Sequence, residues 1–150
     1  MVMSADVRVV FIGAGPGSAD LITVRGLHRL RAAEIVLADA LTDPALRAEA
    51  PDAEWIDVGK RGFSGKPGSD FNGQTRINQL LIEHARRIGQ THGAQGTVAR
   101  LKGGDPSLFG RLEEELNALH ADHIPTEVIP GVTAALAAAA VTPGITSVGM

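Results

Sequence analysis

Residues 8–17 have the sequence RVVFIGAGPG, in which a short β-branched and aromatic run stops at a glycine-rich turn. Four similar runs occupy residues 34–37, 54–58, 97–101 and 126–129, and each is followed closely by Gly, Pro or Asp. Consecutive apolar residues in several of these runs indicate strands that are covered on both faces, as in a parallel sheet. The sequence therefore predicts five mainly parallel strands.

Segments with helical spacing of apolar residues lie between the predicted strands. Val24, Leu27 and Leu30 are three residues apart and follow Thr23, which we expect to cap the helix. Strands that alternate with helices predict an α/β fold, an open sheet with helices on both faces. A short helix is expected at 44–50, after the cap Asp43. A second helix is expected from the apolar face on residues 77–88 and should end at Gly89. A third is expected from the apolar face on residues 109–119, beside an acidic, solvated run at 113–115.

The composition describes one domain over residues 1–150 and excludes several classes of function. The chain has a net charge of −3, no cysteine, four Phe and one Trp. Nucleic-acid binders need a basic or aromatic-rich surface, so no nucleic-acid partner is expected. No apolar run approaches the ~20 residues of a membrane span, and the five histidines have no metal-ligand spacing. We expect a cytoplasmic domain without a metal site.

The turn at residues 13–17 lies where a dinucleotide-binding loop would be found, but it fits that role poorly. Ser18 takes the place of the last small residue of the G-x-G-x-x-G pattern, and Pro16 lacks an N–H for phosphate. One alternative is still a nicotinamide dinucleotide site, because Asp39, at the end of the second predicted strand, could bind the ribose. A plain chain-reversing turn is the second alternative. The favoured interpretation is a loop that brings backbone close to a ligand.

Two further segments could approach a ligand. Residues 100–111, RLKGGDPSLFGR, lead from a predicted strand towards a helix, and the paired glycines Gly103 and Gly104 allow close backbone approach. Asp105 could accept a hydrogen bond from a ligand or cap that helix, with Pro106 in its first turn. Residues 130–135, PGVTAA, open an alanine-rich helical segment, which taken alone indicates tight core packing more often than a binding site.

These motifs, taken together and in order, resemble the N-terminal half of the uroporphyrinogen-III C-methyltransferases, within the tetrapyrrole methylase family. The resemblance covers residues 8–145, and the stretch RLKGGDP with FGR is its most specific part. The other matching motifs are GAGPG at 13–17, VGKR at 58–61, Gln74 with Ile77 and Asn78, Glu114 with Glu115, and VIPG at 128–131.

The resemblance implies S-adenosylmethionine as cofactor, bound between two α/β domains. It implies that Asp39 is a proton acceptor and Lys60 a proton donor, although a strand-end carboxylate and a solvated lysine are the plain alternatives. The positions that match the family's cofactor contacts are Pro16, Gly103, Gly104, Asp105, Leu108, Thr133 and Ala134.

The implied reaction transfers methyl groups to two carbons of uroporphyrinogen III and gives precorrin-2, on the route to sirohaem and cobalamin. The electron-rich pyrrole carbon is the nucleophile, so the protein has to align the reactants and remove a proton. Because the substrate carries carboxylates, we expect Arg61, Lys102 and Arg111 to bind it. We also expect a flexible loop at 62–73 that flanks the substrate.

Departures from the family pattern concern activity rather than fold. Ala40 replaces a frequent arginine, and Leu112 with Glu113 replaces a pair of glycines. The resemblance implies a homodimer and a C-terminal domain that these residues do not include. Two alternatives therefore stay open: another family member that acts on a cobalt-precorrin, an RNA or a protein, and a truncated domain without catalysis.

Overall fold

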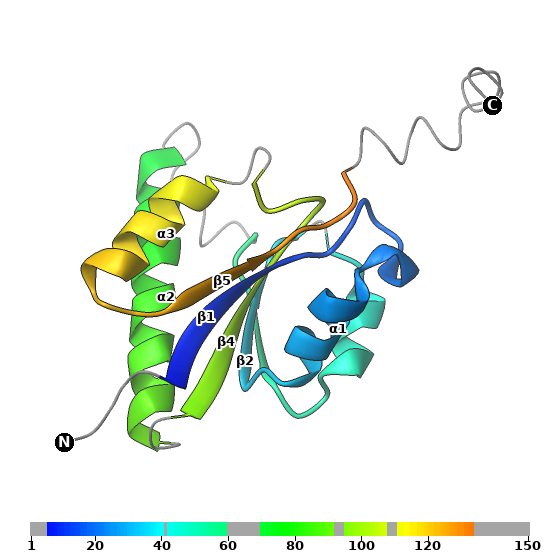
Figure 1. The fold of residues 1–150 in the computed structure, drawn as a ribbon. Coiled ribbons are helices and arrows are strands. Elements are labelled where there is room, and N and C mark those ends of the chain that lie inside the picture. Colours follow the sequence, from blue (N-terminus) through cyan, green and yellow to red (C-terminus); the bar gives the residue numbers. More distant parts are fainter. Residues whose placement is uncertain (1–5, 41, 60–69, 92–94, 108–110, 134–150) are drawn as a thin grey trace, which may run out of the picture.

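The computed structural model describes residues 6–40, 42–59, 70–91, 95–107 and 111–133. They form a five-stranded sheet in which every neighbouring pair of strands is parallel (Figure 1). The strand order is β3-β2-β4-β1-β5. The strands are β1 (Asp6–Gly13), β2 (Ile35–Ala38), β3 (Glu54–Asp57), β4 (Gln95–Lys102) and β5 (Thr126–Ile129).

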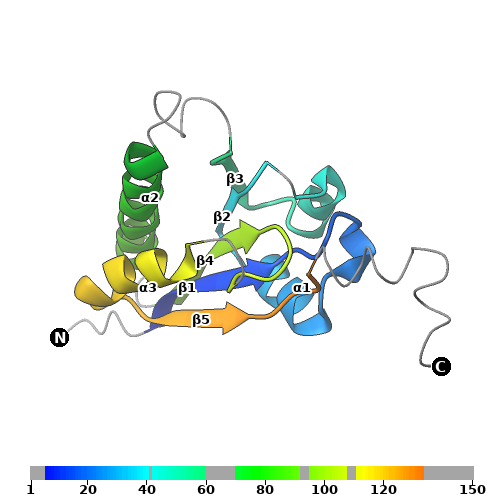
Figure 2. The same ribbon diagram turned by 90° about the horizontal axis from the view of Figure 1, so that it is seen from above.

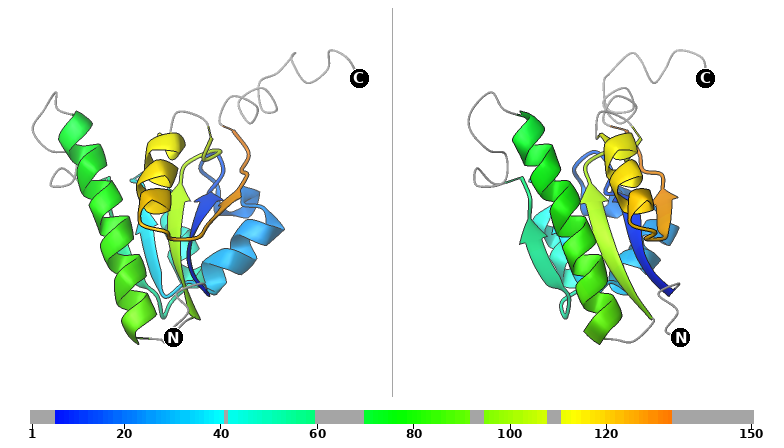
Figure 3. Two further views of the ribbon diagram at one scale, coloured as in Figure 1. Left: turned by 60° about the vertical axis from the view of Figure 1, so that its left-hand side comes forward. Right: turned by 90° about the vertical axis from the view of Figure 1, so that its left-hand side faces the viewer.

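Helices cover both faces of the sheet, which confirms the predicted fold class. The long helix α2 (Asp70–Thr91) and α3 (Leu112–Ala121) lie on one face, and α1 (Val24–Arg31) lies on the other (Figures 1 and 3). Two short 3-10 helices, η1 (Ala19–Leu21) and η2 (Pro44–Glu49), accompany α1. The view from above shows the sheet between the two layers (Figure 2).

The alternation of side chains along β1 explains why both faces need a cover. Val9 and Phe11 pack into the core beneath α2 and α3, whereas Val10 and Ile12 pack into the core on the side of α1. All four side chains are fully buried. Each such burial contributes roughly 1.5–3 kcal/mol of transfer free energy.

Two of the predicted helix caps, Thr23 and Asp43, are confirmed. Thr23 Oγ1 accepts a hydrogen bond from the N–H of Gly26 at 3.0 Å, at the start of α1. Asp43 Oδ1 accepts one from the N–H of Ala45 at 2.9 Å, where η2 begins. These bonds satisfy backbone donors that have no partner within their own helix.

The predicted end of a helix at Gly89 is wrong, because α2 continues to Thr91. A Cβ atom at Gly89 would lie 3.4 Å from Val7 Cγ2, so this glycine lies where the helix packs closely on β1. The last four residues of the expected loop, 70–73, are the first turn of α2, and residues 62–69 lie outside the described part. No helix in the described ranges is long and apolar enough to cross a membrane.

The strand order determines where a ligand can bind. β1 and β4 are neighbours, but the chain leaves β1 towards α1 on one face and leaves β4 towards α3 on the other. The loops that follow the two strands therefore separate at the carboxyl edge of the sheet. In open α/β sheets, ligands bind at such a point.

Candidate functional site

Three loops meet at the carboxyl edge of the sheet, and we call them the glycine cradle: residues 13–17, 103–105 and 130–133. The first two loops are hydrogen-bonded to each other. The N–H of Gly15 donates to the carbonyl of Gly104 at 3.2 Å, and the N–H of Gly104 donates to the carbonyl of Gly15 at 2.8 Å. The sequence predicted backbone close to a ligand in the first two loops, whereas the third alone favoured core packing, and the structure brings the three together.

The glycines in the cradle differ in their surroundings. A Cβ atom on Gly13 would lie 2.7 Å from the carbonyl oxygen of Gly104 and from the backbone of Gly131, so all three loops are in contact there. Gly104 has a positive φ of 67°, and a Cβ atom on it would meet no atom of the described residues within 4 Å. The cradle is therefore tightly packed at Gly13 and open at Gly104.

Asp105 links the second loop to the third. Its Oδ2 accepts a hydrogen bond from the N–H of Gly131 at 3.1 Å, and its Oδ1 accepts from the N–H of Ser107 at 2.8 Å and from the Ser107 hydroxyl. The predicted role of Asp105 as a helix cap is wrong, since α3 begins only at Leu112. The carboxylate closes a local turn and holds the third loop against the second.

The hydrogen bonds to Asp105 predict a dependence of stability on acid. Partial burial raises the pKa of Asp105, but the hydrogen bonds from Ser107 and Gly131 outweigh it and lower the pKa below its usual value of 3.8. A carboxyl group with a lowered pKa in the folded state stabilises the fold above its unfolded pKa and loses that contribution as the pH falls through the folded value. We expect D105N to reduce stability at pH 7 and to have progressively less effect as the pH falls below 3.8. Urea unfolding of both proteins at a series of pH values measures this difference, and a difference that is constant with pH would contradict it.

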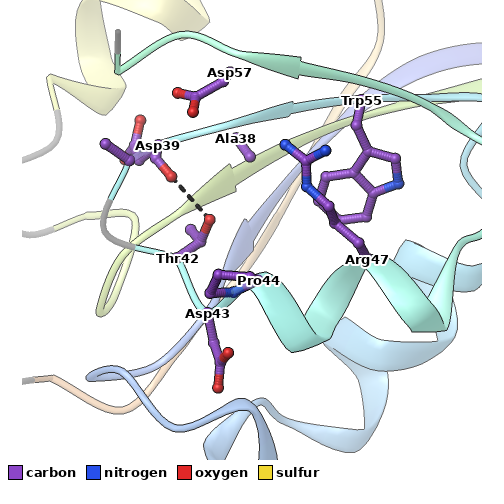
Figure 4. Close-up of a pocket in the computed structure, with 9 residues that line it drawn as sticks. Ala38, Asp39, Thr42, Asp43, Pro44, Arg47, Trp55 and Asp57 are labelled. Carbon is purple, nitrogen blue, oxygen red and sulfur yellow. Dashed lines mark hydrogen bonds between the residues drawn. The ribbon is translucent and has the colours of Figure 1, made fainter.

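Asp39 lines a cavity at the carboxyl ends of β2 and β3 (Figure 4). The cavity has a volume of about 210 Å³. Opposite Asp39, the guanidinium of Arg47 lies over the ring of Trp55, 5.4 Å from its centroid. The lining residues are Ala38, Asp39, Ala40, Thr42, Asp43, Pro44, Arg47, Trp55 and Asp57.

The backbone of Asp39 is fixed on both sides. Its N–H donates to the carbonyl of Leu101 at 3.1 Å, and its carbonyl accepts from the N–H of Thr42 at 3.2 Å and from the Thr42 hydroxyl at 2.8 Å (Figure 4). Its side chain stays 35% exposed, so a ligand in the cavity can reach the carboxylate.

A cluster of buried charges lies behind Asp39, beneath α3. Arg100 Nη1 is 2.8 Å from Asp39 Oδ1, and Arg100 Nε donates to Glu115 Oε1 at 3.0 Å. Lys102 Nζ is 2.5 Å from Glu115 Oε2. We call Asp39, Arg100, Glu115 and Lys102 the charged row, because positive and negative groups alternate along it.

The charged row corrects two expectations. Glu115 is fully buried, although the acidic run at 113–115 predicted a solvated face. Lys102 is buried as well and faces Glu115, so its ammonium group is directed into the protein and away from an incoming substrate. Burial and the neighbouring Arg100 lower the pKa of Lys102, and Glu115 opposes them. Burial lowers the pKa of Arg100, but Glu115 and Asp39 together raise it above its ordinary value.

The remaining predicted site residues have different outcomes. Pro16 and Thr133 are half-buried members of the cradle. Arg111 is exposed and takes a left-handed conformation, with φ at 51°, directly before α3. Among the described residues, no group of three or more His, Cys, Asp or Glu side chains could hold a metal ion. Four predicted site residues lie outside the described part: Lys60, Arg61, Leu108 and Ala134.

Comparison with known proteins gives a consistent result. The model of a family described as Tetrapyrrole (Corrin/Porphyrin) Methylases matches residues 8–146. A siroheme synthase from Tolumonas auensis is 47% identical over 134 residues, which are 89% of this chain and 26% of that protein. A uroporphyrinogen-III C-methyltransferase from Bacillus subtilis is 44% identical over 131 residues, which are 87% of this chain and 25% of that protein.

A solved structure with the same fold carries a ligand. It is the uroporphyrin-III C-methyl transferase from Thermus thermophilus in complex with S-adenyl homocysteine, at 41% identity and a TM-score of 0.69. The match covers 87% of this chain and 51% of that one. The chain thus spans about a quarter of the two curated relatives and about half of the Thermus protein.

Proposed function

The chain belongs to the tetrapyrrole (corrin/porphyrin) methylases, and on that basis we propose that it carries the N-terminal half of a site for C-methylation of uroporphyrinogen III. S-adenosylmethionine is the proposed methyl donor and precorrin-2 the product. The observation that carries the proposal is the glycine cradle, where three loops expose backbone beside the open position at Gly104. The solved relative that binds S-adenyl homocysteine supports the choice of cofactor.

The cradle fits the proposed cofactor because Gly104 has no side chain, so that a ligand on the open side can approach the backbone closely. Gly103, Gly104, Pro16 and Thr133 would contact the cofactor, and Asp105 would hold the third loop in place through Gly131. Leu108 and Ala134 complete the proposed set. When bound, S-adenosylmethionine supplies an electrophilic methyl group.

The proposed role of Asp39 is to accept the proton that the macrocycle loses after one of its pyrrole carbons is methylated. That carbon has no hydrogen, so a C–H bond elsewhere in the macrocycle breaks, its electron pair returns to the conjugated system, and an O–H bond forms on the carboxylate. The position suits this role, since Asp39 lines the cavity and its carboxylate is partly exposed. A well-placed general base contributes roughly 10²–10⁴-fold to such a step.

Binding of the substrate is assigned to basic groups that the family resemblance points to. Arg61 and Arg111 are proposed to bind carboxylates of the tetrapyrrole, and Lys60 to donate a proton. Lys102 is left out of this set because it faces Glu115. The proposal includes a homodimer, which the family resemblance suggests, and a location in the cytoplasm, which the composition favours.

Titration calorimetry with S-adenosylhomocysteine tests the proposal on this chain. We expect saturable binding at one site, and we expect G104V to abolish it, because the new side chain fills the open part of the cradle. The matched control is G17V, since Gly17 also has a positive φ and open surroundings but is exposed at the edge of the first loop. No heat with S-adenosylhomocysteine would favour a domain without catalysis, and saturable binding of NADH instead would favour a dinucleotide site.

A further inference from the structure

We infer that Arg100 is a positioning residue that holds the Asp39 carboxylate in one orientation towards the cavity, and that Glu115 holds Arg100. The inference rests on the proposed function, since it concerns the group assigned to accept the proton. It starts from the charged row, which extends from the cavity into the core beneath α3.

The strand geometry explains how the row is built. Side chains two residues apart on a strand lie on the same face, so Arg100 and Lys102 both point from β4 towards α3. Val98, on that same face, belongs to the apolar core beneath α2 and α3. Two cations therefore replace apolar residues at the carboxyl end of a central strand, and Glu115 on α3 meets both of them.

Stability alone does not explain these buried charges. Taking an ion out of water costs several kcal/mol, and replacement of buried ion pairs by apolar residues is often neutral or stabilising. Arg100 is only 3% exposed, and Glu115 is fully buried. The one member of the row with access to the cavity is Asp39, so the row connects a buried anchor to the exposed carboxylate.

The hydrogen bonds of Arg100 fix its guanidinium group as a rigid unit. Nε donates to Glu115, and Nη1 faces Asp39 while it also approaches the carbonyl oxygens of Leu37 and Leu101 at 3.4 Å each. Because the guanidinium is planar, a bond at Nε determines the direction of Nη1. A lysine at this position would supply the charge but could not maintain both directions.

Glu115 has a second task, which is to separate the two cations. Its Oε1 accepts from Arg100, and its Oε2 lies against Lys102. Without that carboxylate, Lys102 would be a second buried cation near Arg100. Arg100 would then lose the acceptor that keeps its Nη1 directed at Asp39.

The orientation of Asp39 can be measured directly by NMR on this chain. Three-bond couplings between Hα and Hβ report whether a side chain occupies one χ1 rotamer or several. We expect Asp39 to show a single rotamer in the unmodified chain, and averaged couplings in both R100K and the double variant K102M/E115L. The double variant keeps the row neutral and replaces the buried pair by apolar side chains of similar size. E113L is the control, because Glu113 lies in the same turn of α3 but is exposed.

We expect the two variants to lower kcat while KM for the methyl donor stays nearly unchanged. In the form of the protein that transfers methyl groups, this chain or a longer one that contains it, R100K and K102M/E115L should lower kcat about tenfold or more. KM for the methyl donor should change by less than about twofold, because the cradle is untouched.

Two results would overturn the inference. One is a single, unchanged Asp39 rotamer in both variants when their backbone spectra show that they are folded. The other is a rise of KM for the methyl donor in both variants, with no loss of kcat. The calorimetric test of the proposed function is independent of the couplings, so a chain that binds no S-adenosylhomocysteine can still confirm or reject the positioning of Asp39.

Discussion

Replacement of Gly13 by alanine should lower the free energy of unfolding by about 3 kcal/mol. The added Cβ would lie 2.7 Å from the carbonyl oxygen of Gly104 and from the N and Cα atoms of Gly131. All of these are backbone atoms of two other loops, which are themselves held by hydrogen bonds and cannot move aside independently. Urea unfolding followed by circular dichroism measures the loss, and calorimetry should show that S-adenosylhomocysteine binding is lost with it.

G104A and G17A separate this close packing from backbone strain. Both positions have a positive φ, and within the part of the chain that the structure describes a Cβ atom at either would meet nothing within 4 Å. Each substitution should therefore lower the free energy of unfolding by only roughly 1–2 kcal/mol, which is the cost of placing alanine in a left-handed or similarly unfavourable backbone conformation. If G13A costs no more than these two variants, the three loops do not pack as closely as the structure shows.

The second large effect is expected for E115L. This substitution leaves Arg100 and Lys102 buried without the carboxylate that both of them face. Removal of one partner from a buried ion pair costs about 3–5 kcal/mol, because the remaining charge is uncompensated. Denaturant unfolding at pH 7 measures the cost, and E113L should stay within about 0.5 kcal/mol of the unmodified chain.

Addition of K102M to E115L should restore most of the lost stability. The double variant removes the Lys102 ammonium together with the Glu115 carboxylate that it faces, so the coupling between the two substitutions should be large and favourable. Additive losses would show that Glu115 acts through packing rather than through its charge. The thermodynamic cycle and the NMR couplings thus divide the roles of Glu115 between stability and orientation.

The strands and the loops that follow them could be predicted because local sequence determines both. The run from Val9 to Ile12 is apolar at every position, as burial on two faces requires, and it stops where glycine allows the chain to turn. Thr23 was predictable as a cap for the same local reason. Gly89 was not, because glycine ends a helix only where tertiary packing does not favour its continuation, and α2 continues along β1.

The charged row depended on tertiary structure and was missed. The run at 113–115 is acidic throughout, and nothing in it distinguishes Glu115 from its exposed neighbours. The available signal lay on the strand, where Arg100 and Lys102 are two residues apart in an otherwise apolar segment. Two cations on the core-facing side of a central strand require an acid from the covering helix. The hydrogen bond between Asp105 and Gly131, 26 residues further along, could not be predicted from a local pattern either.

The paired hydrogen bonds between Gly15 and Gly104 also affect the energetics of ligand capture. Loops joined in this way are already ordered before any molecule arrives, so association does not have to supply the entropy of folding them into shape. Affinity then depends on the contacts themselves, and the encounter rate is not limited by slow rearrangement of this edge of the sheet.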